Sequence, residues 1–179
     1  YKGIFTILSS CASRQLEEVT FRRTVIPVQE LLDTAGKYFK KSMKNRSERI
    51  ELEIEPMEAK VIGDVNQLRF LLENLIDEAL TVREDGVIRL QARKDNEYIR
   101  FLFTDTRREK SVEELNQLFY PNLARMTSGE KGELRGTEYL VCKQIIRDHD
   151  EFAGRRGCRI NAEPAEGGGF TVYFTIPRR

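Results

Sequence analysis

Histidine and cysteine, the side chains that most often hold metals or act as nucleophiles, are few and far apart in this chain. There is one histidine, His149, and there are three cysteines, Cys11, Cys142 and Cys158. A single histidine excludes sites built from several histidines and gives little basis for a Ser-His or Cys-His nucleophile pair. The cysteines lack C-x-x-C spacing, so zinc is not expected. We expect His149 to be a hydrogen-bonded or surface residue and Cys142 a core residue.

Carboxylates and amides near the ends of predicted elements could carry binding chemistry instead. Asp105 ends a predicted strand, where it could face a pocket or simply form a turn. Asn74 lies on a predicted helix, where it could face a pocket or meet solvent or a cap. Neither G-x-G-x-x-G nor the Walker A pattern occurs. These patterns alone therefore name no ligand.

The composition is that of a folded protein without a strong charge bias. The chain has 179 residues, 40% of them hydrophobic and 33% charged, and a formal net charge of +1. This charge gives no global field that would attract nucleic acid, so no nucleic-acid partner is expected. No apolar run reaches the roughly 18 residues of a membrane span. The missing initial Met and the odd cysteine count lead us to expect a piece of a longer protein, in a reducing, cytoplasmic setting.

Hydrophobic periodicity predicts the elements that position these side chains. Helical spacing predicts helices over residues 1–20, 28–43, 65–80, 111–119 and 137–149. Period-two alternation predicts strands over residues 21–27, 49–56, 59–64, 157–164 and 167–177, and two more within 86–105. Asp64 and Ser111 are the expected helix caps, and Asp95 with Asn96 the expected hairpin turn. This order predicts an α+β fold, a two-layer α/β sandwich whose mixed, mostly antiparallel sheet is covered by helices on one face.

Four segments, taken in order, carry a resemblance to a known family. They are GDVNQLRFLLENLIDEAL, FLFTDTRREKSVEELNQLFYP, RGTEYLVCKQIIRDH and GGGFTVYFTIP. They resemble the asparagine-motif helix, the Asp-x-Gly-x-Gly turn with its Phe-x-Pro, the second glycine motif and the closing glycine turn of sensor histidine kinase ATP-binding domains. These domains belong to the Bergerat-fold superfamily, which also includes gyrase-type topoisomerases and MutL. The resemblance implies this fold, with ATP and Mg²⁺ as ligands.

The resemblance implies nucleotide-binding roles for Asp105, Asn74 and Glu78. Asp105 matches the family's aspartate that accepts a hydrogen bond from the adenine amino group. Asn74 matches the first asparagine of the motif, whereas the second, which in the family reaches Mg²⁺ and the phosphates, is Glu78 here. A carboxylate can bind a hard cation, but it also adds negative charge near the phosphates. Asn74 and Glu78 are the expected metal ligands.

Both glycine motifs depart from the family pattern. Arg107 stands in place of a glycine in the first motif, so Arg107, with Arg108 beside it, could occlude the adenine pocket, fold outward or contact phosphate. In the second motif Gly136 is kept, followed by Thr137, and both are expected to bind nucleotide. Glu138 lies in the first helical turn, where it suits the helix dipole and would repel an anion. We therefore expect a damaged phosphate side.

The same resemblance divides the chain and implies its partners. Residues 1–20 are expected to end a dimerisation helix, and residues 21–179 to form the ATP-binding domain, with a nucleotide lid at about 119–135. In the lid, Lys131, Thr127 and Ser128 could contact phosphate or form an ordinary polar loop. No phosphoacceptor histidine is expected, since His149 falls at the end of the domain's last helix. The implied partners are a histidine-bearing dimerisation domain of the same protein, a response regulator and a second copy in a homodimer.

Three functions follow from these residues. The first is an active kinase with an atypical site, which transfers the γ-phosphoryl group of Mg-ATP to a histidine on the dimerisation domain. The second is a pseudokinase that serves as a docking or signal-relay module without binding ATP productively. The third, a chaperone- or MutL-like ATPase, fits less well because the short length and the final strand are more similar to the kinases. Membrane anchoring of the full protein stays open.

Overall fold

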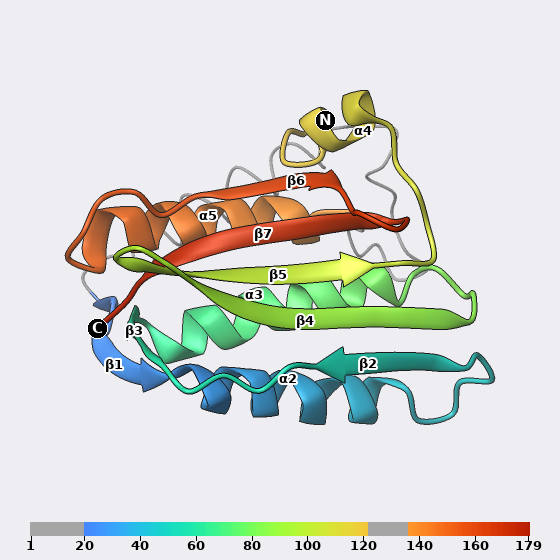
Figure 1. The fold of residues 1–179 in the computed structure, drawn as a ribbon, viewed down its shortest axis with the longest axis horizontal. Helices are drawn as coiled ribbons and strands as arrows, with labels where there is room; N and C mark the ends of the chain where they lie inside the picture. Colours follow the sequence, from blue (N-terminus) through green and yellow to red (C-terminus); the bar gives the residue numbers. More distant parts are fainter. Residues whose placement is uncertain (1–19, 122–135) are drawn as a thin grey trace.

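The computed structural model describes residues 20–121 and 136–179, and its elements follow the predicted order (Figure 1). The helices are α2 (Val28–Ser42), α3 (Val65–Ala79), α4 (Val112–Gln117) and α5 (Glu138–Phe152). The strands are β1 (Thr24–Pro27), β2 (Ile50–Ile54), β3 (Lys60–Gly63), β4 (Gly86–Asp95), β5 (Tyr98–Asp105), β6 (Ile160–Pro164) and β7 (Phe170–Pro177). The helix predicted over residues 1–20 and nearly all of the predicted lid lie outside the described residues.

Five strands form the main sheet, in the order β2-β4-β5-β7-β6. Strands β2 and β4 run parallel, and the other neighbours are antiparallel. Strands β1 and β3 form a separate two-stranded sheet. Helices α2, α3 and α5 lie behind the main sheet in the view of Figure 1. The predicted two-layer sandwich with a mixed, mostly antiparallel sheet is confirmed.

The helices pack on the sheet through apolar stripes. The predicted stripe of α3 is buried, at Leu68, Leu71, Leu72, Leu75, Ile76 and Ala79. In the sheet, the buried rings of Phe101 and Phe174 stack at 4.8 Å between centroids. Each of the three long helices also carries polar residues on its other face, as expected where one side meets water. Among the described residues, no helix is long and apolar enough to cross a bilayer.

Predicted caps fix where the helices begin. Asp64 accepts hydrogen bonds from the backbone N–H groups of Asn66 and Gln67 at the start of α3. The fully buried His149 reaches the same point: its Nε2 accepts the Asp64 N–H at 3.1 Å, and its Nδ1 lies 2.8 Å from the Ile145 carbonyl oxygen. His149 is thus a hydrogen-bonded core residue that ties α5 to the start of α3. Of the two expectations for it, a hydrogen-bonded or a surface residue, the first is confirmed.

Candidate functional site, the end of strand β5

The predicted site lies where β5 ends, at Asp105. This residue pairs with Ile88 on β4 and with Phe170 on β7, and only 3% of it is exposed. Gly169, in the predicted glycine turn, has φ +85°, and a Cβ there would overlap the backbone of Asp105. Glycine is therefore required at this position. The turn before β7 closes over the strand end and helps to bury the carboxylate.

Arg107 points inward and binds this carboxylate with two parallel hydrogen bonds. Its Nε donates to Oδ1 of Asp105 and its Nη2 donates to Oδ2, both at 2.9 Å. The side chains are 1% exposed for Arg107 and 5% for Asp105. A bidentate arginine–carboxylate pair combines charge with matched planar geometry, which makes it among the strongest side-chain hydrogen bonds. The side chain of Arg107 thus folds inward onto Asp105 and not outward; that it occludes an adenine pocket stays a prediction.

The remaining Arg107 donors bind backbone carbonyls at the end of α3 and in the segment that follows it. Nη2 donates to the carbonyl of Ala79 at 2.6 Å, and Nη1 donates to those of Val82 and Glu84, each at 2.9 Å. A guanidinium group has five N–H donors, and all five are now accounted for. Carbonyls at a helix end carry partial negative charge, so they favour a cation here. The end of α3 thus forms a carbonyl cradle (Ala79, Val82 and Glu84) around Arg107.

Gly86 makes room for the stem of Arg107. It has φ +146°, and a Cβ there would lie 2.5 Å from Cγ of Arg107. Any other residue would combine an unfavourable backbone conformation with a steric clash. Sequence reasoning missed both Gly86 and the carbonyl cradle. A glycine just before a strand was the available signal, but nothing local linked it to residue 107.

Arg108, unlike Arg107, forms an exposed ion pair. Its Nη2 lies 3.1 Å from Oε1 of Glu84, and about half of each side chain is exposed. Such an exposed ion pair contributes little to stability. Arg108 also lines the small space that remains near Asp105.

The space that remains beside the ion pair is very small. The cavity measures about 30 Å³. It is lined by Glu78, Ala79, Val82, Phe103, Asp105, Arg108, Lys110, Tyr139 and Phe170. A water molecule needs roughly 10–15 Å³ of such space, whereas pockets for organic ligands measure roughly 300–1,000 Å³. The described residues leave room for water here but not for a purine base.

Asn74 and Glu78, the predicted metal ligands, lie on α3. Asn74 is 8% exposed, and its Nδ2 donates to the carbonyl of Phe70 one turn earlier, at 2.8 Å, a bond that does not use its Oδ1, the atom that would bind a cation. The neighbouring Asp77 accepts a hydrogen bond from the Tyr38 hydroxyl at 2.7 Å, and burial together with this bond raises the pKa of Tyr38. Within the described ranges, no three His, Cys, Asp or Glu side chains come together as metal ligands. A Mg²⁺ ion held mainly by phosphates and water needs no such cluster, so the metal role of Asn74 and Glu78 stays a prediction. Glu78 lines the small cavity.

The start of α5, where the resemblance places the phosphates, keeps one feature of an anion site and loses another. Gly136 has φ +81°, which only glycine adopts without strain. Thr137 precedes the helix but makes no side-chain capping hydrogen bond. Glu138 opens the helix, and its buried Oε2 has no hydrogen-bond partner among the described residues. A phosphate here would meet that carboxylate. The predicted lid contacts Lys131, Thr127 and Ser128 lie outside the described residues.

Comparisons with known proteins agree with the geometry of the fold. A family model described as "Histidine kinase-, DNA gyrase B-, and HSP90-like ATPase" matches residues 63–179. No curated protein matches the chain in sequence.

Solved structures with the same fold include three histidine kinase structures. The nucleotide-free catalytic domain of histidine kinase ThkA has a TM-score of 0.68 and 21% identity, covering 88% of this chain and 96% of that one. The mycobacterial sensor histidine kinase MprB has a TM-score of 0.66 and 19% identity, covering 88% and 99%. ThkA in complex with the response regulator protein TrrA has a TM-score of 0.66 and 18% identity, covering 99% and 49%. At these identities the likeness shows the fold, which is the one predicted.

Proposed function

Because this chain belongs to the histidine kinase-, DNA gyrase B- and HSP90-like ATPase family, we propose that it is the kinase-type domain of a two-component sensor whose adenine site is closed by Arg107. In this proposal it is a pseudokinase domain, which acts by docking and relaying a signal rather than by transferring phosphate. The supporting observation is the buried Arg107–Asp105 pair, because the carboxylate expected to receive the adenine amino group already binds two N–H donors of the same chain.

The charges around the pair support the same proposal. Phosphoryl transfer depends on positioning the phosphates and on neutralising their charge. Here Glu78 and Glu138 stand where neutral groups would suit a phosphate better. A variant in which only the Arg107 side chain is removed should therefore bind the adenine base but still not transfer phosphate.

The proposed partners follow from the family and from one similar structure. Histidine kinase ThkA has been solved in complex with a response regulator, which supports a response regulator as a partner of this domain. Residues 1–20 would end the second helix of the dimerisation hairpin, and that hairpin would carry the acceptor histidine. Residues 21–179 would form the kinase-type domain, and the full protein would act as a homodimer. A cytoplasmic position accords with this role.

A second candidate, an active kinase with a gated site, is favoured by two retained features. Asp105 still ends β5, and Gly136 still has a positive φ before α5. If Arg107 left the carbonyl cradle on contact with a partner, the base could take its place. In this case the isolated domain would be closed and the assembled sensor open.

Calorimetric titration with a non-hydrolysable ATP analogue, with and without Mg²⁺, tests the proposal. We expect no saturable binding to the wild-type domain, with a Kd above about 1 mM. Magnesium-dependent binding that is lost in Asp105→Asn and kept in Asp95→Asn would contradict it. Asp95 is a suitable control because it pairs with Arg100 far from the site. Phosphotransfer by the full-length sensor, again lost in Asp105→Asn, would support the gated kinase instead.

A further inference from the structure

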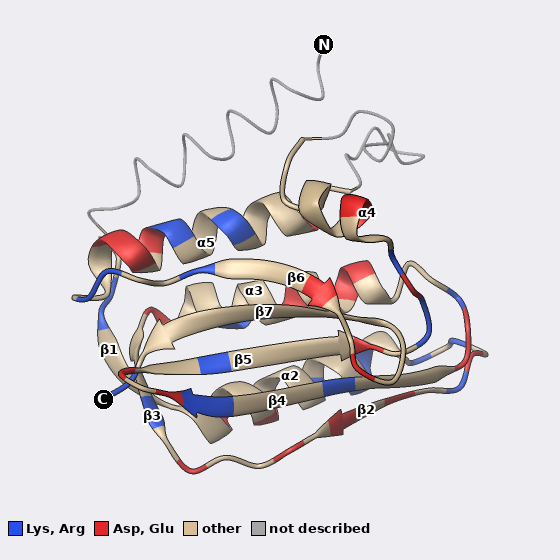
Figure 2. Cartoon of the chain, turned by 45° about the horizontal axis from the view of Figure 1, so that its top comes forward, with Lys and Arg blue, Asp and Glu red and all other residues tan. Residues whose placement is uncertain are grey.

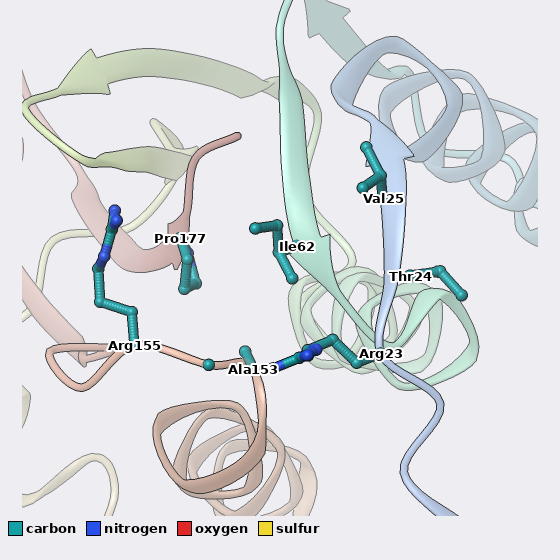
Figure 3. A pocket seen from close by; sticks show the side chains of 8 residues that line it. Arg23, Thr24, Val25, Ile62, Ala153, Arg155 and Pro177 are labelled. Carbon is teal, nitrogen blue, oxygen red and sulfur yellow. The ribbon is translucent and has the colours of Figure 1, made fainter.

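A larger cavity lies at the other end of the sheet from Asp105. It measures about 330 Å³ and opens between β1, β3 and the end of α5 (Figure 3). Pro177 in its wall pairs with Tyr98, the first residue of β5, whereas Asp105 is the last. We call it the arginine pocket, lined by Arg23, Thr24, Val25, Ile62, Ala153, Gly154, Arg155 and Pro177. The volume lies at the lower end of the range for small-ligand pockets, roughly 300–1,000 Å³.

Two guanidinium groups give the arginine pocket its charge. Arg23 forms no ion pair with any described residue, and it lies against Gly154, whose φ of +96° and missing Cβ leave space for its Nη1. Arg155 donates to the carbonyl oxygen of Glu97 at 3.1 Å and lies 3.5 Å from its carboxylate. That contact is long and exposed, so it neutralises Arg155 weakly. Arg23, in contrast, has no carboxylate partner among the residues that the structure describes.

Backbone contacts bring three further cationic residues to the same end of the molecule, where Figure 2 shows blue segments near the chain end. Arg178 forms a β-bridge with Val61, and the N–H of Arg179 donates to the carbonyl of Lys60. Carboxylates lie at this end as well: Glu97 faces Arg155, and Asp150 and Glu151 pair with Arg156.

The other walls of the arginine pocket are apolar. Val25, 42% of which is exposed, comes from β1, and Ile62 comes from β3. Pro177 closes the side nearest the main sheet, as Figure 3 shows. An exposed aliphatic wall beside two guanidinium groups suits a ligand that has an anionic head and an apolar body. Inorganic phosphate alone would use the arginines and leave this wall uncovered.

We propose that the arginine pocket binds a small organic phosphate monoester. The phosphate would bind the guanidinium of Arg23, and the partly exposed side chain of Arg155, which does not point toward Arg23 in Figure 3, would turn toward the phosphate on binding. The organic body would cover Val25, Ile62 and Pro177. Because the pocket joins β1 to the end of α5, such a ligand would bridge the first described strand and the last helix. This site is independent of the adenine site, and it uses none of its residues.

Titration with phenyl phosphate by NMR at low salt tests this proposal, with Arg23→Gln, Arg155→Gln and Arg93→Gln as variants. Arg93 is the matched control, because it pairs with Glu55 on the exposed surface and loses the same charge. We expect saturable binding to the wild type, weakened at least about tenfold in Arg23→Gln and in Arg155→Gln and unchanged in Arg93→Gln. Absent binding, or equal weakening in Arg93→Gln, would overturn it.

Two further arms identify the ligand class. Inorganic phosphate should bind more weakly than phenyl phosphate, and equal affinity would overturn the role given to the apolar wall. Vesicles containing phosphatidic acid should not retain the domain on sedimentation. Retention that is lost in Arg23→Gln would assign the pocket to a lipid headgroup and overturn the small-molecule assignment. Amide spectra of each variant verify that it is folded.

Discussion

The guanidinium of Arg107 and the carboxylate of Asp105 form a bidentate ion pair, with both hydrogen bonds at 2.9 Å and both side chains almost fully buried. An adenine amino group would bring an N–H donor to the same carboxylate, so base and arginine compete for one acceptor. Arg107 also binds the carbonyl cradle after α3, which an incoming base would have to displace. In the proposed adenine site, the residue that replaces a motif glycine would thus fill the space that the glycine leaves open.

Replacing Arg107 by an apolar side chain that keeps water out of the site should destabilise the domain strongly. Arg107→Met leaves Asp105 as a buried carboxylate without its partner, and such a loss costs about 3–5 kcal/mol. The free energy of unfolding in urea measures this cost. Arg108→Met, the neighbouring control with an exposed partner, should cost less than about 1 kcal/mol. Equal costs for the two variants would mean that the buried pair does not stabilise the fold.

Replacing the glycine beneath the arginine should be costly only while the arginine is present. In Gly86→Ala the new Cβ would lie 2.5 Å from Cγ of Arg107, in addition to backbone strain of about 1–3 kcal/mol. In the Arg107→Gly background the strain remains but the clash is gone. Gly167→Ala is the control for strain alone, because φ is +88° and nothing lies within 4 Å of its Cβ position. A double-mutant cycle measures the difference, and no coupling between residues 86 and 107 would refute this packing.

The buried thiol of Cys158 should make stability fall at alkaline pH. Burial, and secondarily the carboxylate of Asp150, raises the pKa of Cys158 from 9.0 to about 12. Between these values the unfolded chain loses its thiol proton while the folded chain keeps it, so the free energy of unfolding decreases as pH rises. The loss is about 1 kcal/mol at pH 10. Urea melts from pH 8 to 10 should show this extra loss in the wild type and not in Cys158→Ala, and parallel pH profiles would contradict the shift.

The fold could be predicted from the sequence because its signals are local. The caps at Asp64 and Ser111 and the turn at Asn96, which has φ +55°, are each decided by a few neighbouring residues. The apolar stripe of α3 likewise needs only its own periodicity. These features, taken in order, were sufficient to place the strands and helices of a two-layer sandwich.

The orientation of Arg107 could not be predicted, because most of its partners are remote in sequence or are backbone groups. They comprise a carboxylate two residues away, three carbonyls from residues 79–84 and the space above Gly86. A side chain with five donors goes where acceptors gather, and backbone carbonyls leave no mark in the sequence. Asn74 illustrates the same limit, since the orientation of its amide depends on a hydrogen bond to the backbone carbonyl of Phe70 one turn earlier.

Titration of the wild type and of Arg107→Gly with adenosine, monitored by NMR, tests most directly whether Arg107 occupies the adenine site. Adenosine carries no phosphate, so Glu78 and Glu138 cannot mask base recognition. We predict no saturable binding to the wild type and saturable binding to Arg107→Gly, abolished by adding Asp105→Asn. Adenosine binding by the wild type, or none by a folded Arg107→Gly variant, would contradict the account.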